Sequence, residues 1–216
     1  MVSAVPAFKN IPTDTWVQVT WEEYIEFLDI SADEKTRCYY DSGEMRIEMA
    51  PLGFSHARDN AILSKVISLF ATFKMIRVAE CVNCTFRQSG IRDSQPDLAF
   101  YLGEDIRFPP CNNEPVGVDI YGAPQLVIEI ASNSLSEGLG NKHLLFERLG
   151  VNEYWVINVA TSKVIAFSVT DGGSTEIRGS KVLPGLAIET VEEALQRGQS
   201  DDDGAINRWL IEQFSQ

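Results

Sequence analysis

The chain has 216 residues, of which 44% are hydrophobic, 10% aromatic and 23% charged. This length suffices to bury a core without disulfides, and the composition excludes a largely disordered, collagenous or coiled-coil protein. The net charge of −13, from 31 acidic and 18 basic residues, argues against broad electrostatic binding of nucleic acid, but it leaves room for a locally basic groove.

Neither a secretory signal nor a membrane span is expected. Residues 1–10 lack the charged start, apolar stretch and cleavage site of a signal peptide, and no run of about 18 apolar residues occurs. The four cysteines, at positions 38, 81, 84 and 111, are too few for a disulfide framework. We therefore predict one cytoplasmic domain.

Helices are predicted from capping residues and apolar periodicity. Thr20 and Glu23 have the spacing of a capping box, which predicts a helix through about residue 28. Ser55 is expected to cap a longer helix that ends near Lys74. Gly150 should end a further helix in the left-handed conformation. The helix after Ser55 is expected over 55–74 and the helix before Gly150 over 139–149. Two more helices are expected near the C-terminus, over 190–197 and 205–214.

Short alternating or apolar segments predict the strands. In the segment 44–50, Met45, Ile47 and Met49 are expected on a buried face, with Arg46 on the polar face. A long loop is expected over 103–122, which holds three prolines and little periodicity. The expected strands are 37–41, 44–50, 76–82, 85–88, 97–101, 126–131, 153–159, 163–169 and 174–178.

This order of elements predicts an α/β fold, with a mixed sheet flanked by helices. We divide the chain into an N-terminal extension over 1–19, a main domain over 20–198, and an acidic linker with a C-terminal helix over 199–216. No internal repeat occurs.

A carboxylate interrupts the most apolar strand. Glu129 lies in the middle of the run 126–131, where an ionised side chain needs a cation, a hydrogen-bonding partner or a proton. A structural ion pair with an Arg or Lys would explain Glu129 equally well by itself.

A second strand-borne carboxylate, Asp97, favours a functional interpretation. Two carboxylates on adjacent strands, together with a backbone carbonyl and waters, would suit Mg²⁺ or Mn²⁺. Such an ion could polarise a phosphate and activate a water for attack on phosphorus. The sequence therefore suggests a metal site at Asp97 and Glu129.

Lys142 lies on the helix that follows the Glu129 strand. Apolar residues stand three, four and seven positions after it, which places Lys142 on the stripe that faces the sheet. A lysine there commonly extends its ammonium to water. Above an acidic pair, the ammonium would instead clamp a scissile phosphate or orient the attacking water.

The ordered set of these segments resembles a known family. PDLAFY (96–101), QLVIEIAS (125–132), Lys142 and GVNEYWVIN (150–158) are similar to the core of the Uma-two family of predicted endonucleases. That family belongs to the PD-(D/E)xK, restriction-endonuclease-like superfamily. The hairpin YYDSGEMRIEMAP and the segment VLPGLAIETVEEAL resemble the family's flanks, so that the resemblance covers about residues 20–196.

The resemblance implies a restriction-endonuclease-like fold and a Mg²⁺-dependent hydrolase that acts on DNA. Asp97 and Glu129 would be the metal ligands and Lys142 the catalytic lysine, moved to the helix from the usual position two residues after the acid, where this chain has Ala131. Glu48 and His56 match family positions that carry polar residues, and they would line the site.

Two positions depart from the family's pattern. Gly138 replaces a common acidic residue and Phe146 a frequent tyrosine, which leaves the metal ligands intact. The alternative is a non-catalytic acidic binding or assembly module that keeps the nuclease fold. Nucleases of this fold often pair to cut two strands, so that a homodimer is expected by analogy.

One further motif is ambiguous. Cys81-x-x-Cys84 could begin a zinc site, but a second cysteine pair at suitable spacing is absent from the sequence. In a regular strand the two side chains would point to opposite faces of the sheet.

Overall fold

The sheet that carries the apolar strand 126–131 lies at the centre of the molecule. The computed structural model describes residues 11–31, 36–49, 53–131, 135–170 and 173–215. The strands of the central sheet are β4 (Val78–Val82), β7 (Leu98–Leu102), β9 (Leu126–Ala131), β10 (Glu153–Asn158), β11 (Lys163–Thr170) and β12 (Gly173–Ile177). Their order is β12-β11-β10-β9-β7-β4; β9 and β10 are parallel, and the other neighbours are antiparallel.

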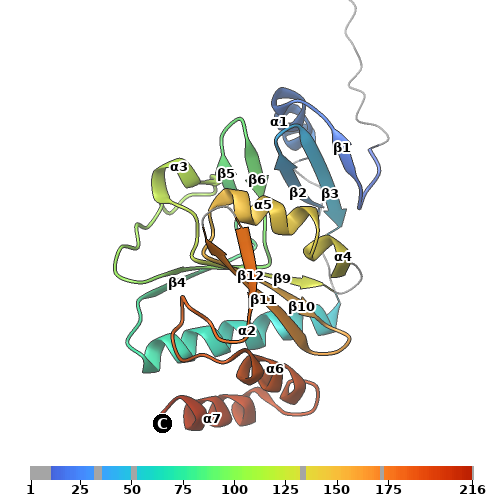
Figure 1. Cartoon of the computed structure of the whole chain (residues 1–216). Coiled ribbons are helices and arrows are strands. Elements are labelled where there is room, and N and C mark those ends of the chain that lie inside the picture. Colours follow the sequence, from blue (N-terminus) through green and yellow to red (C-terminus); the bar gives the residue numbers. More distant parts are fainter. Residues whose placement is uncertain (1–10, 32–35, 50–52, 132–134, 171–172, 216) are drawn as a thin grey trace, which may run out of the picture.

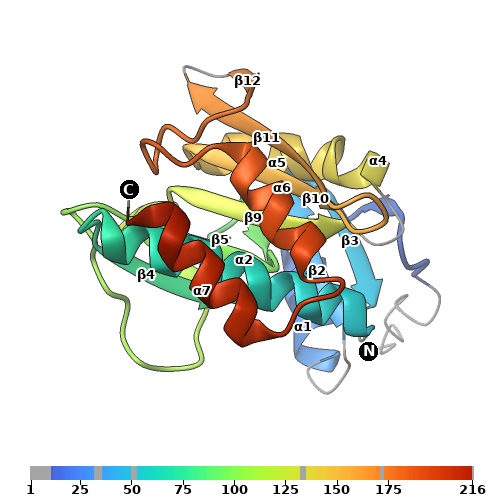
Figure 2. The same ribbon diagram turned by 90° about the horizontal axis from the view of Figure 1, so that it is seen from below.

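Helices cover both faces of this sheet (Figure 1). Their bounds are α2 (Phe54–Phe73), α4 (Leu135–Gly138), α5 (Asn141–Leu149), α6 (Ile188–Arg197) and α7 (Asp203–Phe214). On one face, α2, α6 and α7 lie next to one another (Figure 2) and share the largest apolar cluster with the strands. On the other face, α5 packs over a second cluster that includes Leu145, Phe146 and Tyr154. The predicted α/β class, a mixed sheet flanked by helices, is confirmed.

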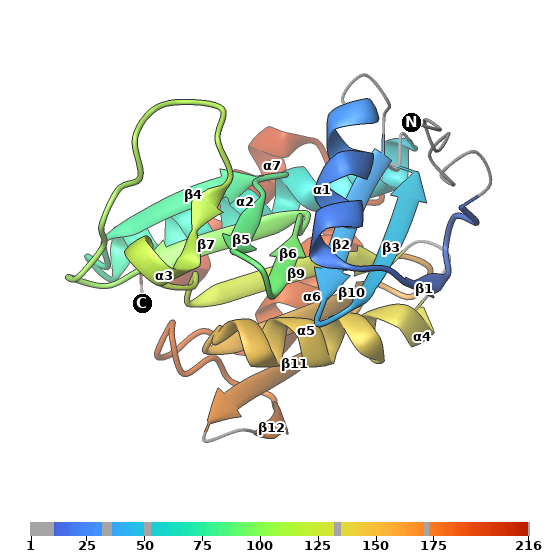
Figure 3. The ribbon, with the colours of Figure 1, turned by 90° about the horizontal axis from the view of Figure 1, so that it is seen from above.

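A second sheet stands above α5 and the central sheet. It contains β1 (Trp16–Gln18), β2 (Thr36–Asp41), β3 (Glu44–Met49), β5 (Phe86–Gln88), β6 (Arg92–Ser94) and β8 (Val116–Gly117), in the order β1-β3-β2-β6-β5-β8. Helix α1 (Trp21–Ile30) packs Tyr24 and Phe27 against the apolar side of β2 and β3. Seen from above, α1 lies over this hairpin and α5 runs beside it (Figure 3).

Local signals decide where several helices begin and end. Thr20 accepts a hydrogen bond from the amide of Glu23, and the Glu23 side chain accepts one from the amide of Thr20, so that the predicted capping box is confirmed. Gly150 ends α5 at a φ of 92°, which also agrees with the prediction. The predicted cap at Ser55 is wrong, because Gly53 is the N-cap of α2, and no described side chain donates or accepts a capping hydrogen bond there.

Two predicted loops contain regular structure. The loop expected over 103–122 includes β8 and the short helix α3 (Val118–Tyr121). Residues 135–138, expected to be part of a loop, form α4. Neither helix is longer than one turn, which is too short to produce a detectable apolar period.

The C-terminal segment is tied to α2. Arg58 donates to the carbonyls of Gly198 and Asp201, and Lys65 lies 2.8 Å from a carboxylate oxygen of Asp203. Leu210 and other apolar residues of α7 belong to the main core. In the described part of the chain, every helix is too short or too polar to cross a membrane.

Candidate active site

The sheet register brings Asp97 and Glu129 together. Leu98 of β7 pairs with Ile128 of β9 in an antiparallel arrangement. Asp97 directly precedes β7, so that the same register sets Asp97 opposite Glu129, with both side chains on one face. The two residues are 1% and 5% exposed, respectively. Two acids that are distant in sequence thus lie on neighbouring strands.

Asp97 is held ionised by donors on three sides. Its Oδ1 accepts from the guanidinium of Arg37 and lies 3.0 Å from Nε2 of His56, and its Oδ2 accepts from the amide of Ile130 at 2.7 Å. Burial alone would raise the pKa of Asp97, but the His56 hydrogen bond and the Arg37 charge outweigh it and lower the pKa. Asp97 is therefore a fixed negative charge.

Glu129 has weaker partners. Its Oε1 accepts from the Tyr39 hydroxyl at 3.2 Å, and its Oε2 lies 3.5 Å from Nζ of Lys142. Burial is the main cause that raises the pKa of Glu129, and the nearby charges of Asp97 and Glu48 add to it. Lys142 opposes these effects, and the net pKa is about 7. The positive charge around Glu129 is therefore insufficient to keep it fully ionised at neutral pH.

Lys142 extends from α5 between two carboxylates. Its Nζ lies 2.6 Å from Oε2 of Glu48 and 3.5 Å from Oε2 of Glu129, and 4.1 Å from the centre of the Tyr39 ring. Burial alone would lower the pKa of Lys142, but the charges of Glu129 and Glu48 outweigh it and raise the pKa. Lys142 thus stays protonated although it is only 6% exposed. We refer to Glu48, Asp97, Glu129 and Lys142 as the site cluster.

Both predicted site-lining residues contact the other members of the site: Glu48 is part of the site cluster, and His56 binds one of its carboxylates. Glu48 comes from β3 and binds Lys142, and its other oxygen accepts from Nε of Arg46 at 2.6 Å. His56 comes from the first turn of α2 and binds Asp97. All five residues singled out from the sequence therefore lie within one network of contacts.

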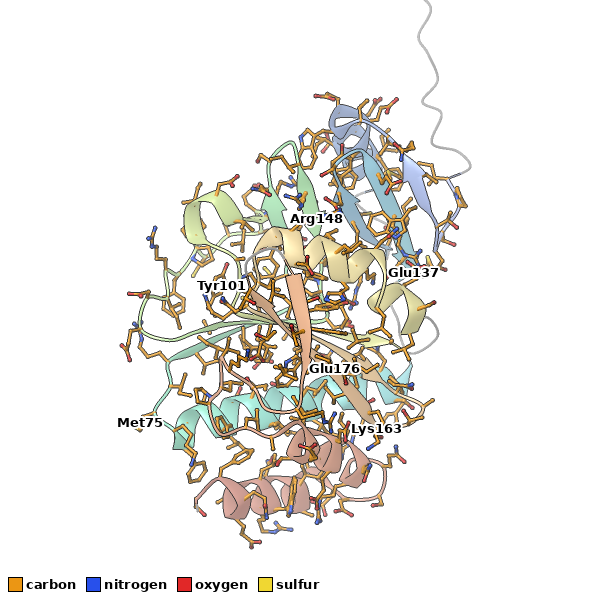
Figure 4. The ribbon with its side chains drawn as sticks, in the orientation of Figure 1. Met75, Tyr101, Glu137, Arg148, Lys163 and Glu176 are labelled. Carbon is orange, nitrogen blue, oxygen red and sulfur yellow. The ribbon has the colours of Figure 1, made fainter. Side chains whose placement is uncertain are left out.

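Ion pairs hold the second sheet against α4 and α5. Besides Lys142 and Glu48, Arg148 pairs with Asp41 at 2.6 Å, and Arg46 lies 3.5 Å from Glu137. Figure 4 shows Glu137 and Arg148 on the helices that run beside the hairpin. These contacts hold the hairpin beside α4 and α5, and from β2 Arg37 reaches Asp97 and Tyr39 reaches Glu129.

Sequence reasoning missed three members of the network, Arg37, Tyr39 and Arg46. Arg37 lies opposite Glu48 and Tyr39 opposite Arg46 in the β2–β3 register, so that they share one face. Arg46 was expected on the polar face of its strand, but it is 1% exposed, whereas Met49, expected to be buried, is 61% exposed. The alternation of polar residues on both strands of the hairpin is the signal that could have identified this second buried face.

The chemistry of the site cluster suits a divalent cation. No three His, Cys, Asp or Glu side chains among the described residues converge tightly enough to enclose an ion by themselves. Mg²⁺ is commonly bound by only one or two carboxylates, and waters and substrate phosphate complete the coordination shell. Asp97 and Glu129 are two such carboxylates on one face, and burial, together with the charges of Asp97 and Glu48, raises the pKa of Glu129, which a bound cation would oppose. The residues therefore fit the ion.

Comparisons with known proteins identify the family. No curated protein matches this chain. A solved structure, described as a "putative nuclease belonging to DUF820" from Anabaena variabilis, has a similar fold, with a TM-score of 0.54 at 16% identity. The match covers 82% of this chain and 99% of that one. Residues 21–210 match the Uma2 family, described as "Putative restriction endonuclease". The chain therefore belongs to the Uma2 family.

Proposed function

We propose that this protein is a Mg²⁺-dependent or Mn²⁺-dependent endonuclease that hydrolyses phosphodiester bonds of DNA. Membership of the Uma2 family supports a nuclease. The observation that carries the specific proposal is the convergence of Lys142 with Glu129, which lies opposite Asp97 on the neighbouring strand. Two acids beside an amine are the groups that metal-assisted attack on phosphorus requires.

Asp97 and Glu129 would hold the metal ion. When bound, the ion supplies a Lewis acid that polarises the phosphate and lowers the pKa of a water molecule. The hydrogen bonds from His56 and Ile130 fix the orientation of the Asp97 carboxylate. The Tyr39 hydroxyl does the same for Glu129.

Lys142 would contact the scissile phosphate. Its buried ammonium is kept charged by Glu48 and Glu129, so that it can offset negative charge that develops on the phosphoryl oxygens. Water then adds to phosphorus, the phosphorus–oxygen ester bond breaks, and the leaving oxygen takes a proton. Glu48 positions Lys142 through the 2.6 Å contact.

A nicking assay tests this proposal. Supercoiled plasmid is incubated with the wild-type protein and Mg²⁺ or Mn²⁺, beside Asp97→Asn and Lys142→Ala. Lys163→Ala and Glu176→Gln are matched controls, because both side chains are exposed on strands β11 and β12 (Figure 4). We expect metal-dependent nicking by the wild type and both controls, and a loss of at least about a hundredfold in the two site variants.

A thermal unfolding experiment reports metal binding separately. An ion that binds only the folded state must raise the melting temperature, by an amount that grows with its concentration. We expect Mg²⁺ to stabilise the wild type and to have a smaller effect on Asp97→Asn. The proposal is refuted if millimolar Mg²⁺ or Mn²⁺ produces no nicking and also leaves the melting temperature of the wild type unchanged.

The second candidate is a binding or assembly module without catalysis. The ion pairs within the site favour it, because Arg37 already neutralises Asp97, and Lys142 lies closer to Glu48 than to Glu129. DNA binding without cleavage, unchanged by Lys142→Ala, would select this candidate.

A further inference from the structure

Cys81 and Cys84 lie side by side at the edge of the central sheet. Strand β4 ends at Val82, and Asn83 adopts a φ of 52°, in the left-handed region, which turns the chain back. As a result both cysteines pack against the same apolar cluster, and their thiols are close enough for each to shift the pKa of the other; the Cys84 thiol also donates to the carbonyl of Thr85 at 3.8 Å. The expectation of opposite faces is therefore wrong, because the regular strand stops between them.

The two thiols are chemically unequal. The contact with Cys81 lowers the pKa of the Cys84 thiol, whereas the same contact and burial raise the pKa of Cys81. Both side chains are half-buried, so that solvent reaches them. An activated thiol beside a protonated one is the arrangement that promotes thiol–disulfide exchange.

The turn between the cysteines contacts the candidate active site. The amide of Asn83 donates to the carbonyl of Asp97 at 3.1 Å, and the Asn83 side-chain oxygen accepts from the guanidinium of Arg37. The same guanidinium is paired with the Asp97 carboxylate. The Asn83 carbonyl also accepts from the side chain of Gln95 at 3.1 Å. A change in the shape of this turn must therefore alter the surroundings of Asp97.

We propose that Cys81 and Cys84 form a reversible dithiol–disulfide pair that adjusts the candidate active site. With glutathione disulfide as oxidant, the Cys84 thiolate attacks one sulfur, and the disulfide bond of the oxidant breaks to release one glutathione thiolate. The Cys81 sulfur then loses its proton to solvent and attacks Cys84 in the mixed disulfide, which releases the second glutathione. Two cysteine thiols are oxidised, and one glutathione disulfide is reduced to two thiols.

Closing the bond changes the turn. A disulfide requires a sulfur–sulfur distance of about 2.05 Å and a Cβ–Cβ distance of about 3.5–4.5 Å, closer than two hydrogen-bonded thiols need. Asn83 lies between the bonded residues and must move with them. The hydrogen bond between the Asn83 side chain and Arg37 is the contact that we expect this movement to change most.

Mass spectrometry tests the pair directly. The full-length protein, with exposed Cys111 changed to Ser to prevent disulfides between copies, is equilibrated with mixtures of reduced and oxidised glutathione. Free thiols are alkylated and the protein is digested with trypsin, which should release residues 78–87 as one peptide that contains both cysteines. We expect this peptide to lose the mass of both thiol hydrogens, to escape alkylation, and to return to the dithiol form on reduction.

Single variants identify the attacking thiol. Cys81→Ser should trap glutathione on Cys84, and Cys84→Ser should form far less adduct. The inference is overturned if both cysteines of the folded protein are still alkylated after equilibration with excess glutathione disulfide. It is also overturned if glutathione remains attached to Cys84 of the wild type.

The effect on the site rests on the proposed nuclease function and has its own readout. We expect oxidation to slow plasmid nicking by about tenfold or more, the loss that removal of one hydrogen bond to a charged group produces. Nicking by Cys84→Ser should not respond to glutathione disulfide. A disulfide that leaves nicking unchanged would refute the link to the site. If no form of the protein nicks DNA, the nuclease proposal fails, and the mass measurement still decides whether the disulfide forms.

Discussion

Asp93 offers a quantitative test of how burial controls charge in this fold. The residue lies on β6, is fully buried, and accepts a 2.7 Å hydrogen bond from Nε of Arg87 on Oδ2. Its Oδ1 has no well-formed hydrogen bond within the described ranges, and the side chain lines a cavity of about 390 Å³. Burial raises the pKa of Asp93 from its ordinary 3.8 to about 6, although Arg87 opposes the change.

The sign of the effect on stability follows from this direction. Below the pKa of the unfolded chain, Asp93 is protonated in both states and costs nothing. As pH rises toward the folded pKa of about 6, the unfolded state ionises first, so that the free energy of unfolding falls. At 1.36 kcal/mol for each tenfold change in proton affinity, the full cost above that pKa is about 3 kcal/mol.

Asp93→Asn should remove this pH dependence, because the amide resembles the neutral acid. We expect the free energy of unfolding of the variant, relative to wild type, to be higher at pH 7.5 than at pH 5 by about 1.4 kcal/mol. Urea unfolding at the two pH values measures the difference. Asp29→Asn, an exposed carboxylate on α1, controls for the general loss of one negative charge. An equal difference at both pH values, or the opposite sign, would refute the reasoning.

Two further substitutions test the surroundings of the site cluster. Lys142→Met should lower the free energy of unfolding by about 3–5 kcal/mol, because the buried carboxylates of Glu48 and Glu129 would lose their cation. Urea unfolding measures this loss. A loss below about 1 kcal/mol, which is what an exposed ion pair contributes, would contradict the expectation. Gly138→Ala places a Cβ 2.8 Å from Cγ1 of Val156 and should cost about 1–3 kcal/mol. A higher melting temperature in that variant would show that the favourable helix propensity of alanine outweighs the contact.

The positions of the acids could be predicted because they depend on local patterns and on pairing between adjacent strands. Glu129 is exceptional within an apolar run of six residues, and Asp97 directly precedes the strand that pairs with it. Lys142 could be placed by the helical period of the residues after it. Each of these inferences needs only a short stretch of sequence and the geometry of one element.

The cations that surround the acids could not be predicted in this way. Arg37 and Arg46 belong to a hairpin that reads as having one buried and one polar face, yet its polar face is buried against α4 and α5. Arg37 pairs with Asp97, which lies 60 residues further along the chain, and a single residue gives no signal of such a pair. The strand β6 was also missed, because three residues are too few to show alternation.

The departure at Gly138 has a structural explanation. The family's common acidic residue would need room for a side chain here, but Gly138 is buried and its position faces Val156 of β10. The neighbouring Glu137 provides a carboxylate instead, directed to Arg46 and to the indole of Trp16. An acidic group is therefore present one residue earlier in the sequence, and its contacts lie outside the site cluster.

The charges of the site cluster connect metal binding to substrate binding. Glu48, Asp97 and Glu129 bring three carboxylates together. Among the described Lys and Arg side chains, Arg37 and Lys142 pair with them, whereas Arg46 is shared with Asp14 and Glu137. A phosphate would meet net negative charge there, in a chain that carries −13 overall. A divalent cation would reverse the sign at that point, so that under the proposed function metal and DNA should each strengthen the binding of the other by the same factor. If DNA affinity does not change with Mg²⁺, metal binding and DNA binding are independent. The argument that the ion attracts DNA by offsetting the negative charge of the site is then wrong.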